Sequence, residues 1–258
     1  MKRLLIFFIA INFVLCKNHT NYRKIGAIEY EADEYPLYVV DIRNYDLLGG
    51  FYQHKCMGTL LSQTWVISAK HCYTKLSASD VAVFHGDVYI YNAISYKVYK
   101  IILHDKGDLA LLNIERINVP DKFIPKLSRK RCPQDVRAVY HSWGGTGHPI
   151  FVISRYLLYS TNDVNVWACP YPANNICFRP VDGTIPMEGD SGSGFITGYG
   201  PGPMFPESRD IKIIGVMEAK YQAPQFNSTE FLDMSLAERL SDYIPWITKY
   251  VPNLTILS

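Results

Sequence analysis

Gly189-Asp190-Ser191-Gly192 is the stretch of this chain from which both fold and chemistry can be argued. A serine hydroxyl is a good nucleophile only when a base takes its proton and the backbone around it is shaped in advance. Glycines on both sides permit a tight turn, in which the N–H groups of Gly189 and Ser191 can converge on a developing oxyanion. Taken alone, the stretch is also compatible with an ordinary turn that contains a serine.

Two further stretches supply the residue types that such a serine needs. Ser68-Ala69-Lys70-His71-Cys72 follows an expected strand, and Asp108-Leu109-Ala110-Leu111-Leu112 places an acid before another. Singly, His71 is most simply a core histidine beside a disulfide and Asp108 a turn residue. Together, the order His71, Asp108, Ser191 is one known solution for combining a general base, an orienting acid and a nucleophile.

The composition is that of a folded, nearly neutral protein. The 258 residues carry 26 basic and 24 acidic side chains, a formal net charge of +2, and 48% are hydrophobic. This balance disfavours a protein held on nucleic acid by charge, and the length suits one large domain or two small ones. No His/Cys cluster has metal-ligand spacing and no phosphate-binding glycine loop occurs, so we expect neither metal nor cofactor.

The N-terminus has the pattern of a secretory signal. The basic head Met1-Lys2-Arg3 precedes the apolar run 4–15, and Val14 and Cys16 suit signal peptidase. The run is too short to cross a bilayer, so we expect residues 1–16 to be removed and the protein to be secreted without a membrane anchor. Removing Cys16 leaves five of the six cysteines, for which two disulfides and one remaining thiol is the simplest arrangement. Sequons for glycosylation begin at Asn18, Asn227 and Asn253.

The body of the chain reads as short strands separated by turns, a spacing typical of β-sandwiches and barrels rather than βαβ units. One helix is expected near the end, with Asp242 as its cap, Pro245 in its first turn and Pro252 after it. A Gly- and Pro-rich segment, 198–206, indicates a surface loop. The expected strands are 38–40, 65–67, 81–84, 98–103, 109–112, 136–140, 150–158, 194–196 and 211–217.

After about residue 24, the chain resembles the trypsin/chymotrypsin family of secreted serine proteases. Besides the three motifs, Trp143-Gly144, Ile214-Gly215-Val216 and Tyr243-Ile244-Pro245-Trp246-Ile247 resemble a turn, a strand and the terminal helix of that family. The resemblance implies an all-β fold of two packed six-stranded antiparallel β-barrels with a C-terminal α-helix. The barrels would span residues 25–125 and 126–258, with the site in the cleft between them.

The same resemblance implies roles for single residues. Ser191 would be the nucleophile, His71 the general base and then acid, and Asp108 the group that orients the imidazole. The N–H groups of Gly189 and Ser191 would form the oxyanion hole. Asp190 would pair with the α-amino group that zymogen cleavage frees.

Disulfides follow from the resemblance as well. It implies a Cys56–Cys72 bond and identifies Cys177 as a disulfide cysteine, with Cys169 as its partner. Cys132 then remains unpaired or bridges another chain.

The activation segment departs from the family's pattern. The residues 17–24 would be a short propeptide, and a cut after Lys24 frees Ile25. A cut after Arg23 would instead leave Lys24 first and bring a second ammonium group towards a buried pocket, which is costly. A third interpretation is that no activating cut occurs.

The specificity pocket departs too. Ile185 stands where a trypsin has aspartate, so an Arg or Lys substrate side chain would be buried unpaired, and an apolar preference is expected. Glu218 and Lys220 occupy the substrate-binding strand. Lys70 and Glu218 both replace small residues near Asp108, and we expect them to form a compensating ion pair.

These residues predict a secreted serine endopeptidase that acts on protein or peptide substrates. Protease inhibitors are expected as possible further partners. The alternative is a homologue with little or no activity that serves as a binding or regulatory protein. The intact His71, Asp108 and Ser191 favour the enzyme, whereas Lys70 and Glu218 favour the alternative. A lipase or esterase is disfavoured because the triad order differs and no Gly-x-Ser-x-Gly elbow follows a strand.

Overall fold

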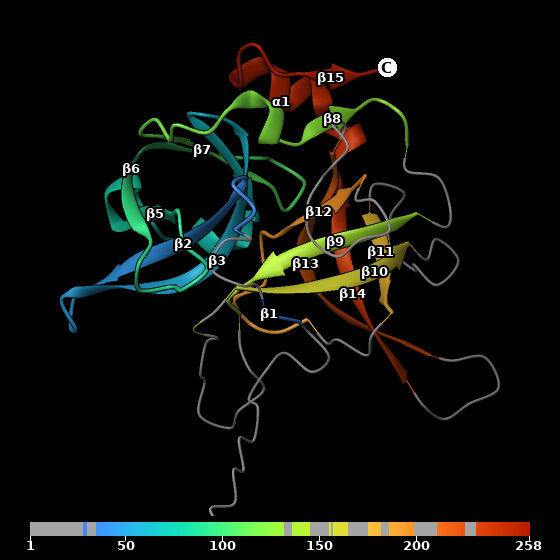
Figure 1. Cartoon of the computed structure of the whole chain (residues 1–258), viewed down its shortest axis with the longest axis horizontal. Helices are drawn as coiled ribbons and strands as arrows, with labels where there is room; N and C mark the ends of the chain where they lie inside the picture. The colour runs from blue at the N-terminus through green and yellow to red at the C-terminus, as the bar shows by residue number, and fades with distance from the viewer. Residues whose placement is uncertain are drawn as a thin grey trace, which may run out of the picture.

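The computed structural model describes residues 28–29, 35–131, 136–144, 155, 157–164, 175–181, 186–198, 211–224 and 231–258. These residues form mainly β-strands, with the α-helix α1, Ile244–Tyr250, near the C-terminus (Figure 1). The expected signal segment 1–16 and propeptide 17–24 lie outside the described residues.

The first half of the chain folds into a closed antiparallel barrel. The strand order around it is β2-β3-β4-β7-β6-β5, and β5 pairs back with β2. Alternate apolar side chains fill its interior, so that Val40, Leu60 and Val66 are fully buried. The strands are β2 Val39–Asp46, β3 Phe51–Ser62, β4 Trp65–Ser68, β5 Val81–His85, β6 Ile94–Leu103 and β7 Ala110–Ile114.

The second half forms a ring of six antiparallel strands. In order, β9, β10, β11, β14, β13 and β12 each pair with the next, and β12 pairs back with β9. The bounds are β9 Arg137–Ser142, β10 Leu158–Val164, β11 Asn175–Pro180, β12 Gly194–Thr197, β13 Lys212–Pro224 and β14 Phe231–Arg239. The expected all-β fold with a C-terminal helix is confirmed.

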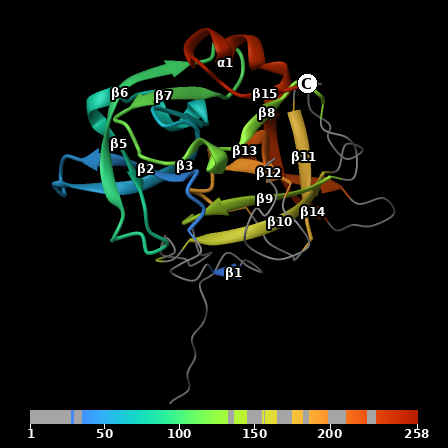
Figure 2. The ribbon, with the colours of Figure 1, turned by 45° about the horizontal axis from the view of Figure 1, so that its top comes forward.

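Three short strands extend this sheet. β1, Ile28–Glu29, pairs with β10, while β8, Lys126–Ser128, runs parallel to both β13 and β15, Ile256–Leu257. Both views show the two barrels side by side, with α1, β15 and β8 together at one end of the molecule (Figures 1 and 2).

The terminal helix packs its apolar face into the core, as its sequence predicts. Ile244, Ile247 and Val251 are buried in a hydrophobic cluster that also contains residues of both barrels. Among the described residues, no helix has the length and apolar character needed to span a membrane.

Two details differ from the expectations. Asp242 does not cap α1, because Tyr243 is the N-cap and Asp242 ends the 3-10 helix Leu240–Asp242. The Asp242 carboxylate lies 3.4 Å from Arg131 instead. The strand expected at 150–158 begins only at Leu158, and most of the residues before it lie outside the described part of the chain.

Candidate active site

His71 and Asp108 come from the first barrel and are in direct contact. Nδ1 of His71 lies 2.6 Å from Oδ2 of Asp108, and the backbone N–H of His71 donates to Oδ1 at 2.8 Å. One carboxylate therefore fixes both the imidazole ring and the backbone that carries it. Nε2 remains as the ring nitrogen available for proton transfer.

The fold explains why these two residues meet. His71 lies in the 3-10 helix Lys70–Tyr73 just after β4, and Asp108 comes just before β7. Since Ser68 at the end of β4 pairs with Ala110 at the start of β7, the two segments leave the barrel side by side. The Cys56–Cys72 disulfide, which is present as expected, ties the histidine segment to β3.

Ser191 lies in a loop of the second barrel whose backbone requires glycine. Gly189 and Gly192, on either side of it, have φ angles of +93° and +87°, in the left-handed region that side chains disfavour. In the described part of the chain, the N–H groups of Gly189 and Ser191 donate no hydrogen bond. Neither N–H group is therefore used by another group among the described residues.

The Ser191 loop is held directly against the first barrel. Met57 N–H donates to the carbonyl of Ser191 at 2.8 Å. A Cβ atom on Gly192 would lie 2.2 Å from Met57 O and 2.3 Å from Ser68 Oγ, so only glycine allows this approach. Ser191 is thus brought to the barrel that carries His71, although no hydrogen bond joins its Oγ to the imidazole among the described residues.

Asp190, next to Ser191, is buried, with 1% of its surface exposed. Its Oδ2 accepts a hydrogen bond from Met187 N–H at 2.9 Å, and the Tyr140 hydroxyl lies 3.4 Å away. Burial raises the pKa of Tyr140, so this phenol stays neutral beside the carboxyl group. The expected partner, an α-amino group at Lys24 or Ile25, lies outside the described residues.

Glu238 is a site residue that the sequence analysis missed. Its Oε1 accepts a hydrogen bond from the backbone N–H of Asp108 at 2.6 Å, and its Oε2 accepts one from the Tyr243 hydroxyl at 2.5 Å. Only 4% of Glu238 is exposed. A strand of the second barrel therefore holds the backbone of Asp108, while the Asp108 carboxylate contacts His71.

The expected ion pair between Lys70 and Glu218 is wrong. The Lys70 ammonium donates instead to the carbonyls of His104 and Asp105, at 2.7 and 3.2 Å, where turn carbonyls need donors. Glu218 Oε2 accepts from the Asn175 amide at 3.0 Å.

Among the described residues Glu218 forms no ion pair with a Lys or Arg side chain, and its pKa is shifted. Its partial burial, and then repulsion by the nearby carboxylates of Glu238 and Asp108, raise the pKa of Glu218 to about 7. The site thus holds a carboxyl group whose charge changes near neutral pH.

Two pockets flank the candidate site and share Glu218 and Ala219. One, of about 540 Å³, is lined by His71 and Asp108. The other, of about 460 Å³, is lined by Ser191 and by the expected specificity residues Glu218 and Lys220. Glu218 and Lys220 therefore lie in the same pocket as Ser191.

Two further predictions fall on residues that the structure does not describe. Ile185, the expected base of the pocket, lies outside the described residues. So does Cys169, although Cys177 is disulfide-bonded.

Comparisons with known proteins agree with this architecture. The family model described as Trypsin matches residues 29–247. Granzyme M of Rattus norvegicus is 25% identical over 223 residues, which cover 77% of this chain and 80% of that protein. Serine protease SP24D of Anopheles gambiae is 27% identical over 114 residues, 39% of this chain and 42% of that protein. Because the family match covers most of a chain that folds as described above, this protein belongs to the trypsin family of serine proteases.

Proposed function

We propose that this protein is a serine endopeptidase that hydrolyses peptide bonds through an acyl-enzyme. The observation that supports the proposal most is the pair formed by His71 and Asp108, at 2.6 Å, on the barrel against which the Ser191 loop packs. In enzymes without bound substrate, catalytic hydrogen bonds such as that between serine and histidine are often long and tighten when substrate binds.

The proposed reaction uses groups already described. Ser191 Oγ attacks the substrate carbonyl carbon while His71 Nε2 takes its proton, and Asp108 stabilises the imidazolium that forms. The oxyanion accepts hydrogen bonds from the N–H groups of Gly189 and Ser191. His71 then protonates the leaving amine, and water attacks the acyl-enzyme by the reverse sequence of steps.

The proposed substrates are proteins or peptides with an apolar residue before the scissile bond. Met187 and Met217 line the pocket beside Ser191, which supports an apolar preference. Lys220 lines it together with the acidic residues Glu188, Asp190 and Glu218, so the preference rests on the apolar residues and not on the charge of Lys220. In the sequence, Ile185 stands where a trypsin has aspartate, so the expected countercharge for Arg or Lys is missing. Protein inhibitors of serine proteases would occupy the same pocket.

We further propose that the protein is secreted as a zymogen. The support is the basic head and apolar run within residues 1–16, followed by the short segment 17–24 with Arg23 and Lys24 at its end. Asn253 begins a sequon and is exposed, which suits glycosylation in the secretory pathway.

Labelling with a fluorophosphonate tests the proposal. The chain is produced behind a removable leader so that its N-terminus is Ile25, which is verified by sequencing before labelling. Wild-type protein should be labelled at Ser191, and Ser191→Ala should not. Ser193→Ala is the matched control, because the Ser193 hydroxyl donates to the carbonyl of His141 and lies two residues from the nucleophile.

Absence of labelling on the processed chain would contradict the proposal. The chain would then be an inactive homologue that binds or regulates other proteins, the alternative that Glu218 favours. Labelling retained in Ser191→Ala would instead show that another residue is the nucleophile.

A further inference from the structure

We propose that His54 is a positioning residue that holds Gly189 in the orientation its N–H needs as an oxyanion donor. This inference rests on the proposed function and assigns a part of that site for which the sequence carries no motif. His54 lies on β3 and Gly189 in the Ser191 loop, so the contact joins the two barrels.

The contact is the end of a buried chain of polar groups. His54 Nδ1 lies 2.6 Å from Oδ1 of Asp41, and Nε2 lies 3.2 Å from the carbonyl oxygen of Gly189. The side chains of His54 and Asp41 are 1% and 0% exposed. A carbonyl oxygen only accepts hydrogen bonds, so Nε2 donates to Gly189.

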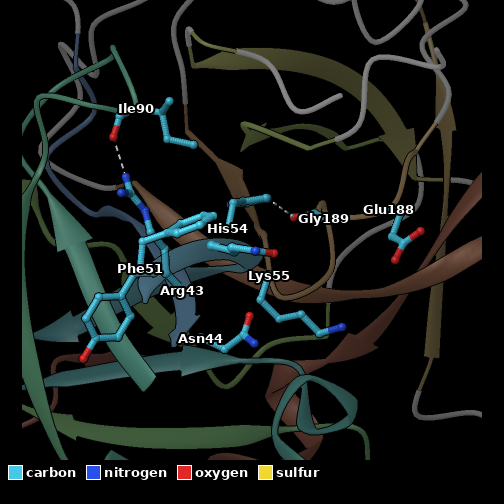
Figure 3. Close-up of a pocket in the computed structure, with 10 residues that line it drawn as sticks. Arg43, Asn44, Phe51, His54, Lys55, Ile90, Glu188 and Gly189 are labelled. Carbon is cyan, nitrogen blue, oxygen red and sulfur yellow. Dashed lines mark hydrogen bonds between the residues drawn. The ribbon is translucent and has the colours of Figure 1, made fainter. Parts of the chain in front are cut away.

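Arg43 completes the group on the side away from Gly189. Its Nε donates to Oδ2 of Asp41 at 2.5 Å, its Nη2 donates to the carbonyl of Ile90, and its guanidinium lies 3.7 Å from the centre of the Phe84 ring. Arg43 and His54 are also cross-strand partners in the β2–β3 register. Figure 3 shows these two side chains next to each other, with the hydrogen bonds to Ile90 and Gly189 dashed.

This arrangement leaves the imidazole little freedom. Asp41 accepts from Nδ1 and is itself fixed by Arg43, so the ring cannot rotate away without leaving a buried carboxylate short of a donor. Acceptors lie at both ring nitrogens, so the two hydrogen bonds form at the same time only when each nitrogen carries a proton.

Gly189 is also confined by Gly144, in the segment after β9. A Cβ atom on Gly189 would lie 2.7 Å from His54 Nε2 and 3.1 Å from Cα of Gly144. The loop is therefore packed between the first barrel and the segment after β9. It is open towards a pocket of about 480 Å³ that His54, Gly189 and Glu188 line together (Figure 3).

A fixed carbonyl matters because only two dihedral angles separate it from the N–H of the same residue. Without the His54 hydrogen bond, the left-handed Gly189 can turn, since glycine has the widest choice of backbone conformations. Its N–H would then point away from the oxyanion position. An oxyanion donor contributes to the transition state only when it is aimed in advance.

Two substitutions separate the two nitrogens of the imidazole. Asn at position 54 keeps a donor near Nδ1 for Asp41 and removes the donor to Gly189, whereas Gln places an amide donor near Nε2. His85→Asn is the matched control, because the buried His85 also bonds through Nε2 to a backbone carbonyl, that of Leu37. Each variant is compared with wild type by thermal unfolding to verify folding.

The first readout does not depend on activity. Hydrogen–deuterium exchange of the peptide that spans Met187 to Ser193 should be faster in His54→Asn, and close to wild type in His54→Gln and His85→Asn. Unchanged exchange in a folded His54→Asn would overturn the inference, whether or not the wild-type chain reacts with fluorophosphonate. Unlabelled wild-type protein would overturn only the proposed function.

The second readout is kinetic. For a wild-type chain that is active, His54→Asn should lower kcat by about 10- to 100-fold, somewhat less than the loss of an oxyanion donor, with KM little changed. Inhibition by a peptide aldehyde, which forms an oxyanion, should weaken by a similar factor. His54→Gln should recover most of both, and failure to recover either would show that His54 serves only the stability of the hairpin.

Discussion

Glu238 accepts a hydrogen bond from the backbone N–H of Asp108 at 2.6 Å, although the two residues belong to different barrels. The buried carboxylate thereby stabilises the turn that presents Asp108 to His71, and the Tyr243 hydroxyl satisfies its other oxygen. The bond places a second negative charge close to Asp108. That charge has consequences for Glu218, which titrates in the same neighbourhood.

Replacing Glu238 with Gln should lower the pKa of Glu218 below about 7, because Glu238 is one of the carboxylates that raise it. The amide oxygen of Gln can still accept from Asp108 N–H, so the turn should persist. Carbon-13 NMR of the Glu218 carboxyl group over pH measures the shift. Asp242→Asn removes the same charge elsewhere and should leave the Glu218 titration as in wild type; equal shifts in the two variants would refute the local effect.

Glu218→Gln should change how stability depends on pH. In the folded protein Glu218 keeps its proton up to a pKa of about 7, whereas in the unfolded chain its carboxyl group has the ordinary pKa of 4.5. Between these pH values the unfolded chain binds fewer protons, so this group lowers wild-type stability as pH rises. The variant should therefore gain stability relative to wild type between pH 4.5 and 7.

Urea unfolding of both proteins at several pH values measures this gain. Glu115→Gln, at an exposed carboxyl group of the first barrel, is the comparison variant. A stability difference between Glu218→Gln and wild type that does not vary with pH would contradict the assignment.

Asp108→Asn should lower kcat by about 10⁴-fold if the proposed function is correct. An amide at this position offers its N–H₂ to His71 Nδ1 and favours the tautomer with a proton on Nε2, which cannot accept the serine proton. The kinetics of hydrolysis of a peptide ester measure the loss. Asp105→Asn, an exposed acid in the same turn, should stay near the wild-type rate, and comparable losses in both would point to general disturbance of the turn.

Gly192→Ala should destabilise the fold and abolish labelling of Ser191. The new Cβ atom would lie 2.2 Å from Met57 O, and the backbone has a φ of +87°. Gly86→Ala separates the two causes, because Gly86 also has a left-handed φ but nothing lies within 4 Å of its Cβ position. Urea unfolding should show a cost of about 1–2 kcal/mol for Gly86→Ala and a larger one for Gly192→Ala. Equal losses of stability in the two variants would show that the contact between Gly192 and Met57 opens at little cost in free energy.

The strands that the sequence predicts best are those with continuous apolar residues, such as β4 and β7. Two long strands that it misses, β3 and β14, each contain a polar residue with a buried side chain. β3 contains His54, and β14 contains Glu238, so neither has a clean alternation of apolar and polar positions. In both strands the interruption is a residue that contacts the candidate site.

Sequence spacing likewise finds only part of the site. The contact between His71 and Asp108 follows from motifs whose order is recognisable. Asp41 and His54 belong to no motif. They come together through the pairing of β2 with β3, and the Ser191 loop then packs on β3. A contact between barrels is a property of the folded chain, which local sequence patterns do not encode.

Because the site is divided between two barrels, the order of synthesis decides when it can form. β13 and β14 follow Ser191 in sequence, and Glu238, which fixes the Asp108 turn, is on the later of them. Domains that are made earlier fold earlier, so the first barrel can fold during synthesis before β13 and β14 exist. At that stage the Ser191 loop lacks the strands that complete the second barrel. A nascent or truncated polypeptide that ends before residue 238 should therefore not react with fluorophosphonate. Reactivity of Ser191 should arise only in a late step, when β14 joins the second barrel.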